Sequence, residues 1–248
     1  MLRANALVNT GREWYALSMS SVLHNIIHIQ ERIDNACARA GRDKTTLRLM
    51  AVSKLQPADR IQEAINFGMR LFGESRVQET RERRHIFPPD AEVHLIGHLQ
   101  RNKARDAVQL YNAVQSIDAL RTIDALETQL IQQEITTPMT IFVEMNTSGE
   151  ESKSGVRSFD ELQVLANRLE ESPLLKMTGL MTIGPFTDDT DRVRRAFSAL
   201  REHRDRLEDV MRTRYPELSM GMSDDLEAAV LEGSTMLRIG TAIFGDRS

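Results

Sequence analysis

Short apolar runs alternate with longer amphipathic stretches along most of the chain. The apolar runs have the length of strands, as in Leu49–Val52, and each following stretch carries apolar residues three to four positions apart. After residue 48 this pattern predicts about eight strand-and-helix units. A stretch with helical spacing between Val22 and Ala40 precedes them, and it predicts a leading helix that ends at Gly41.

The boundaries of the expected elements follow from the apolar spacing and from glycine and proline residues. The first strand covers the apolar run before Lys54, and the other strands are expected at Arg70–Phe72, Glu92–Ile96, Ala113–Ile117, Met139–Met145, Lys176–Met181, Leu218–Met220 and Thr235–Ile239. Helices are expected at Pro57–Phe67, Val77–Ile86, around Asn102 and Lys103, and at Leu120–Glu134, Phe159–Glu170, Arg192–Arg214 and Asp224–Glu232. We expect Ser20 or Ser21 to cap the leading helix and Ser223 to cap the last one.

This alternation is typical of an α/β protein with a (β/α)8 TIM barrel, here with an extra N-terminal helix. A doubly wound open sheet would give the same alternation, because periodicity cannot show that a sheet closes. No linker or low-complexity tract interrupts residues 19–248, so we expect one domain there. Residues 1–18 carry no periodic apolar face and no signal-peptide core, and we interpret them as a disordered extension or a start-site artefact.

Composition narrows the class of protein. Of the 248 residues, 41% are hydrophobic and 27% are charged, an ordinary mixture for a soluble globular protein. A net charge of −4 gives no general attraction to nucleic acid or to an anionic membrane, and no apolar run has the length of a membrane span. Cys37 is the single cysteine, so no internal disulfide can form and a reducing, cytoplasmic location is expected.

Candidate chemistry begins with Lys54, which directly follows the first predicted strand. In β/α folds the residues after the carboxyl ends of strands face the ligand site. A lysine in such a crowded place can lose its proton and form a Schiff base with a carbonyl group. The alternative is a solvated loop lysine.

The last two strand ends indicate a phosphate site. Ser223 follows the seventh strand, and Gly240-Thr241 follows the eighth, where barrels frequently bind phosphate. Amide and hydroxyl groups there can hold an anion, although a helix cap and an ordinary glycine turn would look the same. With Lys54, this suggests either pyridoxal 5′-phosphate or the sugar phosphate of an aldolase. Arg238 favours the first, since a guanidinium only donates hydrogen bonds and would keep a pyridine nitrogen unprotonated.

The chain also resembles a known family, the YggS/PROSC family of pyridoxal phosphate homeostasis proteins. The match extends over nearly all of the chain from Met19 onward. Seven motifs in order carry it: Ala51-Val52-Ser53-Lys54, Phe72–Glu79, His94–Lys103, Ser152–Gly155, Gly179-Leu180-Met181, Leu218–Asp225 and Arg238–Gly245.

The resemblance implies a barrel like the N-terminal domain of alanine racemase, without that enzyme's second domain. It implies that Lys54 binds pyridoxal phosphate through a Schiff base and that Arg238 lies against the pyridine nitrogen. Ser223, Gly240 and Thr241 match the family's phosphate cradle. The cofactor-binding set that we expect is Lys54, Ser75, His98, Met220, Ser223, Arg238, Gly240 and Thr241. Ser75 is a departure, because the family usually has an asparagine there that reaches toward the cofactor.

Three functions compete. The first is a non-catalytic, cytoplasmic carrier or regulator of pyridoxal phosphate in vitamin B6 homeostasis, which passes it to pyridoxal-dependent apo-enzymes and is expected to be a monomer. The second is a pyridoxal-dependent amino-acid racemase, and the third is a Schiff-base aldolase without a cofactor. A racemase needs a base on each face of the substrate, and Tyr111 and Tyr215 both precede strands, on the wrong side of a barrel. His98 is the one alternative base.

Overall fold

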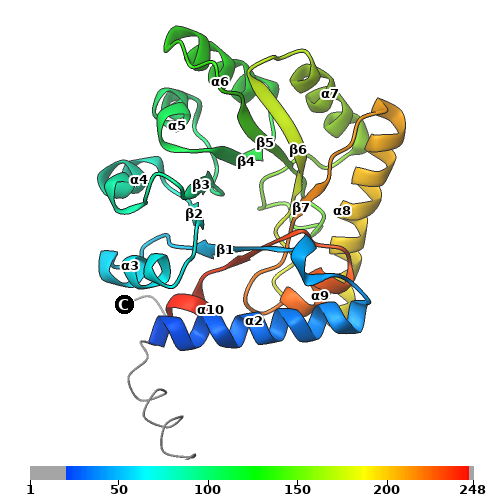
Figure 1. Cartoon of the computed structure of the whole chain (residues 1–248). Coiled ribbons are helices and arrows are strands. Elements are labelled where there is room, and N and C mark those ends of the chain that lie inside the picture. The colour runs from blue at the N-terminus through cyan, green and yellow to red at the C-terminus, as the bar shows by residue number, and fades with distance from the viewer. Residues whose placement is uncertain (1–20, 246–248) are drawn as a thin grey trace, which may run out of the picture.

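The predicted barrel is confirmed. In the computed structural model, which describes residues 21–245, eight parallel strands pair in sequence order and the last pairs with the first, so the sheet closes. The strands stand at the centre of the molecule and the helices surround them (Figure 1). The open-sheet alternative is therefore wrong for this chain.

The strands and helices lie close to the predicted ranges. The strands are β1 (Arg48–Val52), β2 (Leu71–Glu74), β3 (Glu92–Leu95), β4 (Ala113–Ile117), β5 (Met139–Glu144), β6 (Leu175–Met181), β7 (Glu217–Ser219) and β8 (Met236–Ile239). The helices are α2 (Ser21–Ala40), α3 (Ala58–Asn66), α4 (Val77–Arg83), α5 (Ala104–Leu110), α6 (Leu120–Gln132), α7 (Phe159–Glu170), α8 (Thr190–Met211), α9 (Leu226–Leu231) and α10 (Thr241–Phe244). Short 3₁₀ turns are η1 (Lys44–Thr46), η2 (Arg84–Ile86) and η3 (Arg101–Lys103).

Two apolar clusters stabilise the barrel. The larger one fills the space between strands and helices and includes Phe72, Phe197 and the inner face of α2. The smaller one includes Met50, Phe142 and Met236. Buried side chains on both faces of the strands explain why the strands read as continuous apolar runs and not as alternating patterns.

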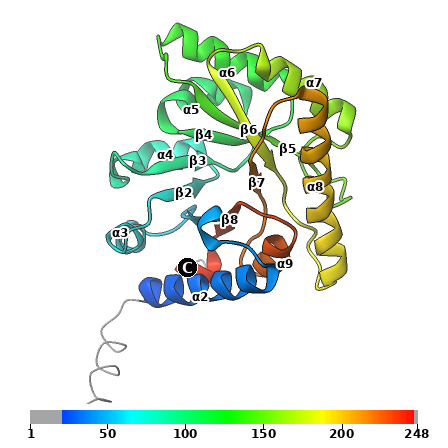
Figure 2. The same ribbon diagram turned by 45° about the vertical axis from the view of Figure 1, so that its right-hand side comes forward.

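The leading helix α2 lies along one side of the barrel. It packs beside α9 and α10, as both views show (Figure 2). Asn25 donates a hydrogen bond to the carbonyl oxygen of Ile243, and Arg32 forms an ion pair with Glu227 at 2.8 Å. Helix α2 therefore holds the segments that follow β7 and β8. Cys37 lies on this helix and is buried.

Some local predictions are wrong. Ser223 does not cap the helix predicted at Asp224–Glu232, because the observed helix α9 begins at Leu226 and Asp225 is its N-cap. The hydroxyl of Ser223 instead accepts a hydrogen bond from the amide of Ala242, in α10, at 3.2 Å. The apolar spacing of the helix predicted at Leu120–Glu134 also places Leu120 on its inner face, but this residue is 42% exposed as the first residue of α6. The spacing in the helix predicted at Arg192–Arg214 likewise places Val210 inward. Val210 is 49% exposed, because the buried face of α8 continues from Leu207 toward Met211, four residues on.

Two predictions concern the start of the chain. Ser21 is already helical, so it is not the N-cap of α2. Ser20 lies outside the described residues, and so do residues 1–18, for which an extension or a start-site artefact was predicted. Both interpretations stay predictions.

Gly179 allows β6 and β7 to approach each other closely. It pairs with Glu217, and a Cβ atom added at Gly179 would overlap the backbone carbonyl of Glu217. We expect Gly179→Ala to lower the free energy of unfolding by roughly 1–3 kcal/mol, because the neighbouring backbone must shift. Urea titration would measure this, with Lys176→Ala, an exposed site on the same strand, as the control. Equal stability of the Gly179→Ala and control proteins would contradict the close approach.

Candidate functional site

A pocket opens at the carboxyl ends of the strands. Its volume is about 200 Å³, and it collects residues that follow β1, β3, β6, β7 and β8. The lining residues are Val52, Lys54, Gln56, Ile96, Ile183, Met222, Ser223, Asp224, Arg238, Gly240 and Thr241. Five of the eight residues predicted to bind the cofactor thus share one pocket: Lys54, Ser223, Arg238, Gly240 and Thr241.

The turn after β1 fixes the backbone of Lys54. The amide of Gln56 donates to the carbonyl oxygen of Ser53 at 3.1 Å, and Leu55 has a left-handed φ of 61°, as in turns with a positive φ at the third position. The hydroxyl of Ser53 donates to Oε1 of Glu74 at 2.6 Å. This turn is therefore anchored to β2 immediately before the lysine.

Arg238 is a buried cation with fixed geometry. Its side chain comes from β8, the residue is 4% exposed, and Nη1 and Nη2 donate to the Ser219 hydroxyl and the Thr182 carbonyl, each at 2.7 Å. Burial lowers the pKa of Arg238 to about 10, while the nearby carboxylates of Asp225 and Glu144 oppose the change. The guanidinium thus stays protonated near neutral pH and can only donate.

A chain of hydrogen bonds runs behind Arg238 through the barrel. Ser219 accepts from Arg238 and donates to Oε1 of Gln115 at 2.7 Å. Nε2 of Gln115 lies 2.9 Å from Nδ1 of His94, whose Nε2 lies 3.2 Å from the Glu92 carboxylate. Burial lowers the pKa of His94, so the imidazole ring is neutral near pH 7. Because the Gln115 amide donates to Nδ1, the ring proton lies on Nε2, which faces the Glu92 carboxylate.

The phosphate cradle predicted from the sequence has a defined local structure. Helix α10 begins directly after Gly240, and the Ser223 hydroxyl accepts from the amide of Ala242 in its first turn. A Cβ atom at Gly240 would meet Val52 at 3.5 Å, an ordinary contact. The loops after β7 and β8 thereby bring two hydroxyl groups, from Ser223 and Thr241, to the same pocket as Lys54.

The other three predicted cofactor contacts are not in the lining of this pocket. Met220 is completely buried in the larger apolar cluster. Ser75 is half-buried beside Gly97, where an added Cβ would overlap the Ser75 backbone. His98 is exposed and lines a different hollow. Their contacts with a cofactor remain predictions from the resemblance.

Glu144 is a functional candidate that the sequence analysis missed. It is the last residue of β5, is 5% exposed, and lies near enough to Arg238 for their charges to interact. Burial, with the charge of Asp118, raises the pKa of Glu144 to about 7. The available signal was a carboxylate at a strand end, but the predicted strand ran on to Met145 and placed Glu144 inside it.

Lys153, from the Ser-Lys-Ser-Gly motif, connects two loops at the barrel rim. Its Nζ donates to Oε1 of Glu150 at 2.9 Å and to the carbonyl oxygen of Gly184 at 2.8 Å. These bonds join the loop after β5 to the loop after β6. Lys153 therefore links these two loops.

Comparisons with known proteins show the family of this chain. The model of the alanine racemase N-terminal domain matches residues 24–248. A pyridoxal phosphate homeostasis protein of Escherichia coli is 39% identical over 238 residues, which cover 92% of this chain and 98% of the relative. The chain belongs to the family of pyridoxal phosphate homeostasis proteins.

Solved structures extend the comparison. PipY of Synechococcus elongatus, solved with pyridoxal phosphate bound, superposes with a TM-score of 0.78 at 29% identity, covering 90% of this chain and 100% of PipY. Alanine racemase of Bacillus anthracis superposes with a TM-score of 0.69 at 17% identity, covering 91% of this chain and 56% of the enzyme. At 17% identity, the alanine racemase shows only the shared fold.

The raised pKa of Glu144 predicts a pH-dependent stability. Since the native pKa of about 7 lies above the ordinary 4.5, the native state is favoured below about pH 4.5 and loses this advantage as pH rises through about 7. The loss amounts to about 3 kcal/mol, because one pKa unit corresponds to roughly 1.4 kcal/mol. We expect Glu144→Gln to remove this loss, so the variant gains stability relative to the original protein at high pH.

Denaturant titrations at several pH values would measure the difference. Glu82→Gln, which changes an exposed carboxylate on α4, should leave the pH profile unchanged. Parallel profiles for the original protein and Glu144→Gln would show that the Glu144 carboxylate is solvated.

Proposed function

We propose that this chain binds pyridoxal 5′-phosphate through Lys54 and serves as a non-catalytic holder or regulator of the cofactor in the cytoplasm. One observation carries the proposal. A single pocket combines an amine, a buried guanidinium and the hydroxyl groups that follow the last two strands. Each of these groups has a chemical counterpart on the cofactor.

The residues fit the cofactor by their chemistry. Lys54 supplies the amine that reacts with an aldehyde to form a Schiff base. Ser223, Gly240 and Thr241 supply hydroxyl and amide donors for the phosphate. Arg238 is a permanent donor, so it suits an unprotonated pyridine nitrogen. The bound cofactor would supply an electron-accepting ring, which an unprotonated nitrogen weakens.

The relatives support the same reading. The Escherichia coli relative carries the name pyridoxal phosphate homeostasis protein, and the PipY structure contains pyridoxal phosphate. Both are matched over nearly their entire length. The carrier role is therefore favoured over the racemase and over an aldolase without cofactor.

The positions of the tyrosines also argue against efficient racemisation. Tyr111 precedes β4 and donates to Thr80 Oγ1 at 2.7 Å, and Tyr215 precedes β7 and lies 3.0 Å from Glu170. Both rings are buried at the amino ends of strands, away from the pocket mouth. His98 and Glu144 remain as candidate second bases.

We propose that pyridoxal-dependent apo-enzymes receive the cofactor from this protein. No helix in residues 21–245 is long and apolar enough to cross a membrane.

We also propose that the protein is a monomer. Light scattering of the purified protein would measure the mass, and a dimer mass would contradict the proposed monomer.

The Schiff base can be tested by spectroscopy. The original protein mixed with pyridoxal phosphate should develop a visible absorbance band that borohydride abolishes, and Lys54→Ala should lack it. Lys103→Ala, a lysine that does not line the pocket, is the matched control. A band that persists in Lys54→Ala would assign the Schiff base to another lysine.

The non-catalytic role has a separate test. The cofactor-loaded protein would be incubated with L-alanine and other amino acids in deuterated water, and we expect neither α-deuteration nor D-isomers. Rapid exchange that is lost in His98→Ala or Glu144→Gln would make the protein a racemase and overturn this part of the proposal.

A further inference from the structure

The second part of the His94–Lys103 motif, from His98 onward, contributes no residue to the Lys54 pocket, although it carries part of the family resemblance. Two of its residues instead line a second hollow of about 410 Å³ between α5 and α6. The lining residues are Arg101, Asn102, Ala104, Arg105, Arg121, Asp124, Ala125, Thr128 and Gln129. We call this the arginine groove.

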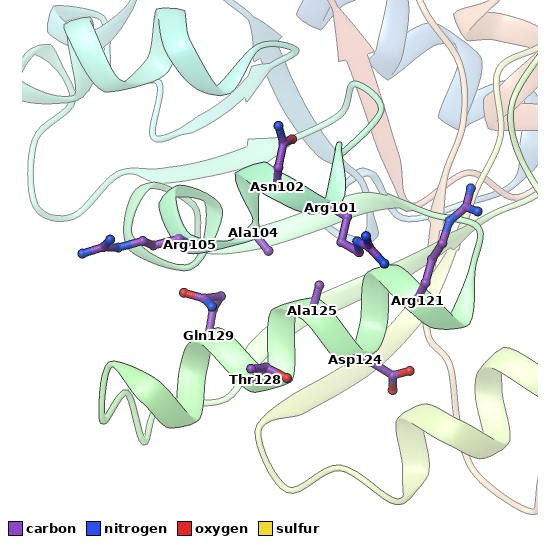
Figure 3. A pocket seen from close by; sticks show the side chains of 9 residues that line it. All are labelled: Arg101, Asn102, Ala104, Arg105, Arg121, Asp124, Ala125, Thr128 and Gln129. Carbon is purple, nitrogen blue, oxygen red and sulfur yellow. The ribbon is translucent and has the colours of Figure 1, made fainter.

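Small side chains form the floor of the arginine groove. Figure 3 shows Ala104 of α5 and Ala125 of α6 facing each other across the gap between the helices. Arg101 and Arg121 lie together at one end, and Arg105 extends at the other. The groove thus combines space at its centre with cationic side chains at its ends.

The positive charge of the groove is not neutralised within the described chain. Within residues 21–245, Arg101, Arg105 and Arg121 form no ion pair with a carboxylate at 4.0 Å or less. By contrast, Arg70 and Arg168 each form one. Asp124 is the acidic residue of the lining. Its carboxylate is bound by Arg168 at 2.9 Å, so it is already paired.

The same two arginines border a neighbouring hollow. Arg101 and Arg121 also line a hollow of about 320 Å³ with His98, Leu99 and Thr122, among which no side chain is acidic. Two adjoining hollows that share two guanidinium groups form a concentrated cationic site at the rim of the barrel. A single exposed arginine without a hollow or a second guanidinium group beside it would be a solvated surface charge.

We propose that the arginine groove binds a small phosphorylated molecule, with Arg101 and Arg121 holding the phosphate. Guanidinium groups bind phosphate with paired, charge-assisted hydrogen bonds, and Arg serves this purpose better than Lys. A volume of about 410 Å³ lies within the usual range for small-molecule sites. The net charge of −4 gives no general attraction to a polyanion such as nucleic acid, which favours a small phosphorylated molecule.

The arginine groove shares no lining residue with the Lys54 pocket. The proposal therefore stands or falls separately from pyridoxal phosphate binding. Both sites lie on the side of the barrel where the strands end. Ile96 directly follows β3 and lines the Lys54 pocket, and Arg101, five residues later, lines the arginine groove.

The test is calorimetric titration of inorganic pyrophosphate into the full-length protein at constant ionic strength, which holds charge screening fixed. We expect Arg101→Gln and Arg121→Gln each to raise the Kd at least tenfold. Arg39→Gln removes the same charge from an exposed position on α2 and should leave the Kd unchanged. Ser223→Ala, in the Lys54 pocket, shows whether pyrophosphate binds at the predicted phosphate cradle instead.

Several outcomes would overturn the proposal. Weakening in Ser223→Ala but not in the groove variants would place the anion in the Lys54 pocket. Equal weakening in Arg39→Gln would reduce the effect to overall charge, and no measurable binding by the original protein would make the groove a solvated surface. Tighter binding of a hexaglutamate peptide than of pyrophosphate would identify a protein-docking surface instead. Circular dichroism of each variant would establish that it is folded.

Discussion

The pairing of β1 with β8 is the constraint on which the site depends. It closes the sheet and sets Met50 beside Arg238 and Ala51 beside Ile239. Lys54 and Gly240 follow directly after these paired segments, so residues almost two hundred positions apart in the chain reach one pocket. An open sheet with the same elements would leave β1 and β8 without this contact, and the amine would be separated from the cradle.

Closure also creates the environment of Arg238. A buried cation is costly unless hydrogen bonds and nearby opposite charges compensate its lost hydration. Ser219 and Thr182 accept its hydrogen bonds, while Asp225 and Glu144 provide negative charge. The polar chain through Gln115 and His94 fixes the Ser219 hydroxyl, so the guanidinium cannot easily rotate to another position. Such rigidity suits the role proposed for Arg238, a hydrogen bond to a pyridine nitrogen.

The polar chain is built from strands on opposite sides of the barrel. His94 and Gln115 come from β3 and β4, and Ser219 and Arg238 come from β7 and β8. Gln115 also contacts Sδ of Met236 at 3.1 Å, so the small apolar cluster and the polar chain share the barrel interior. The interior is therefore partly a structural core and partly the support of the site.

Local patterns along the chain were enough to predict the alternation of elements and part of the candidate site. Apolar runs and helical spacing depend on local chemistry, so β4 and α7 were predicted with their observed bounds. The strand-end positions of Lys54, Ser223, Gly240 and Thr241 were readable because every parallel strand ends on the same face. The closure of the sheet, the bond from the first turn of α10 to Ser223 and the burial of Glu144 near Arg238 became visible only in the folded chain. The three-dimensional arrangement produces all three. It also decided that Gln115 and Ser219 meet and that Arg101 and Arg121 border one groove. These are contacts between distant segments, and no periodicity along the chain encodes which side chains will face each other across a barrel.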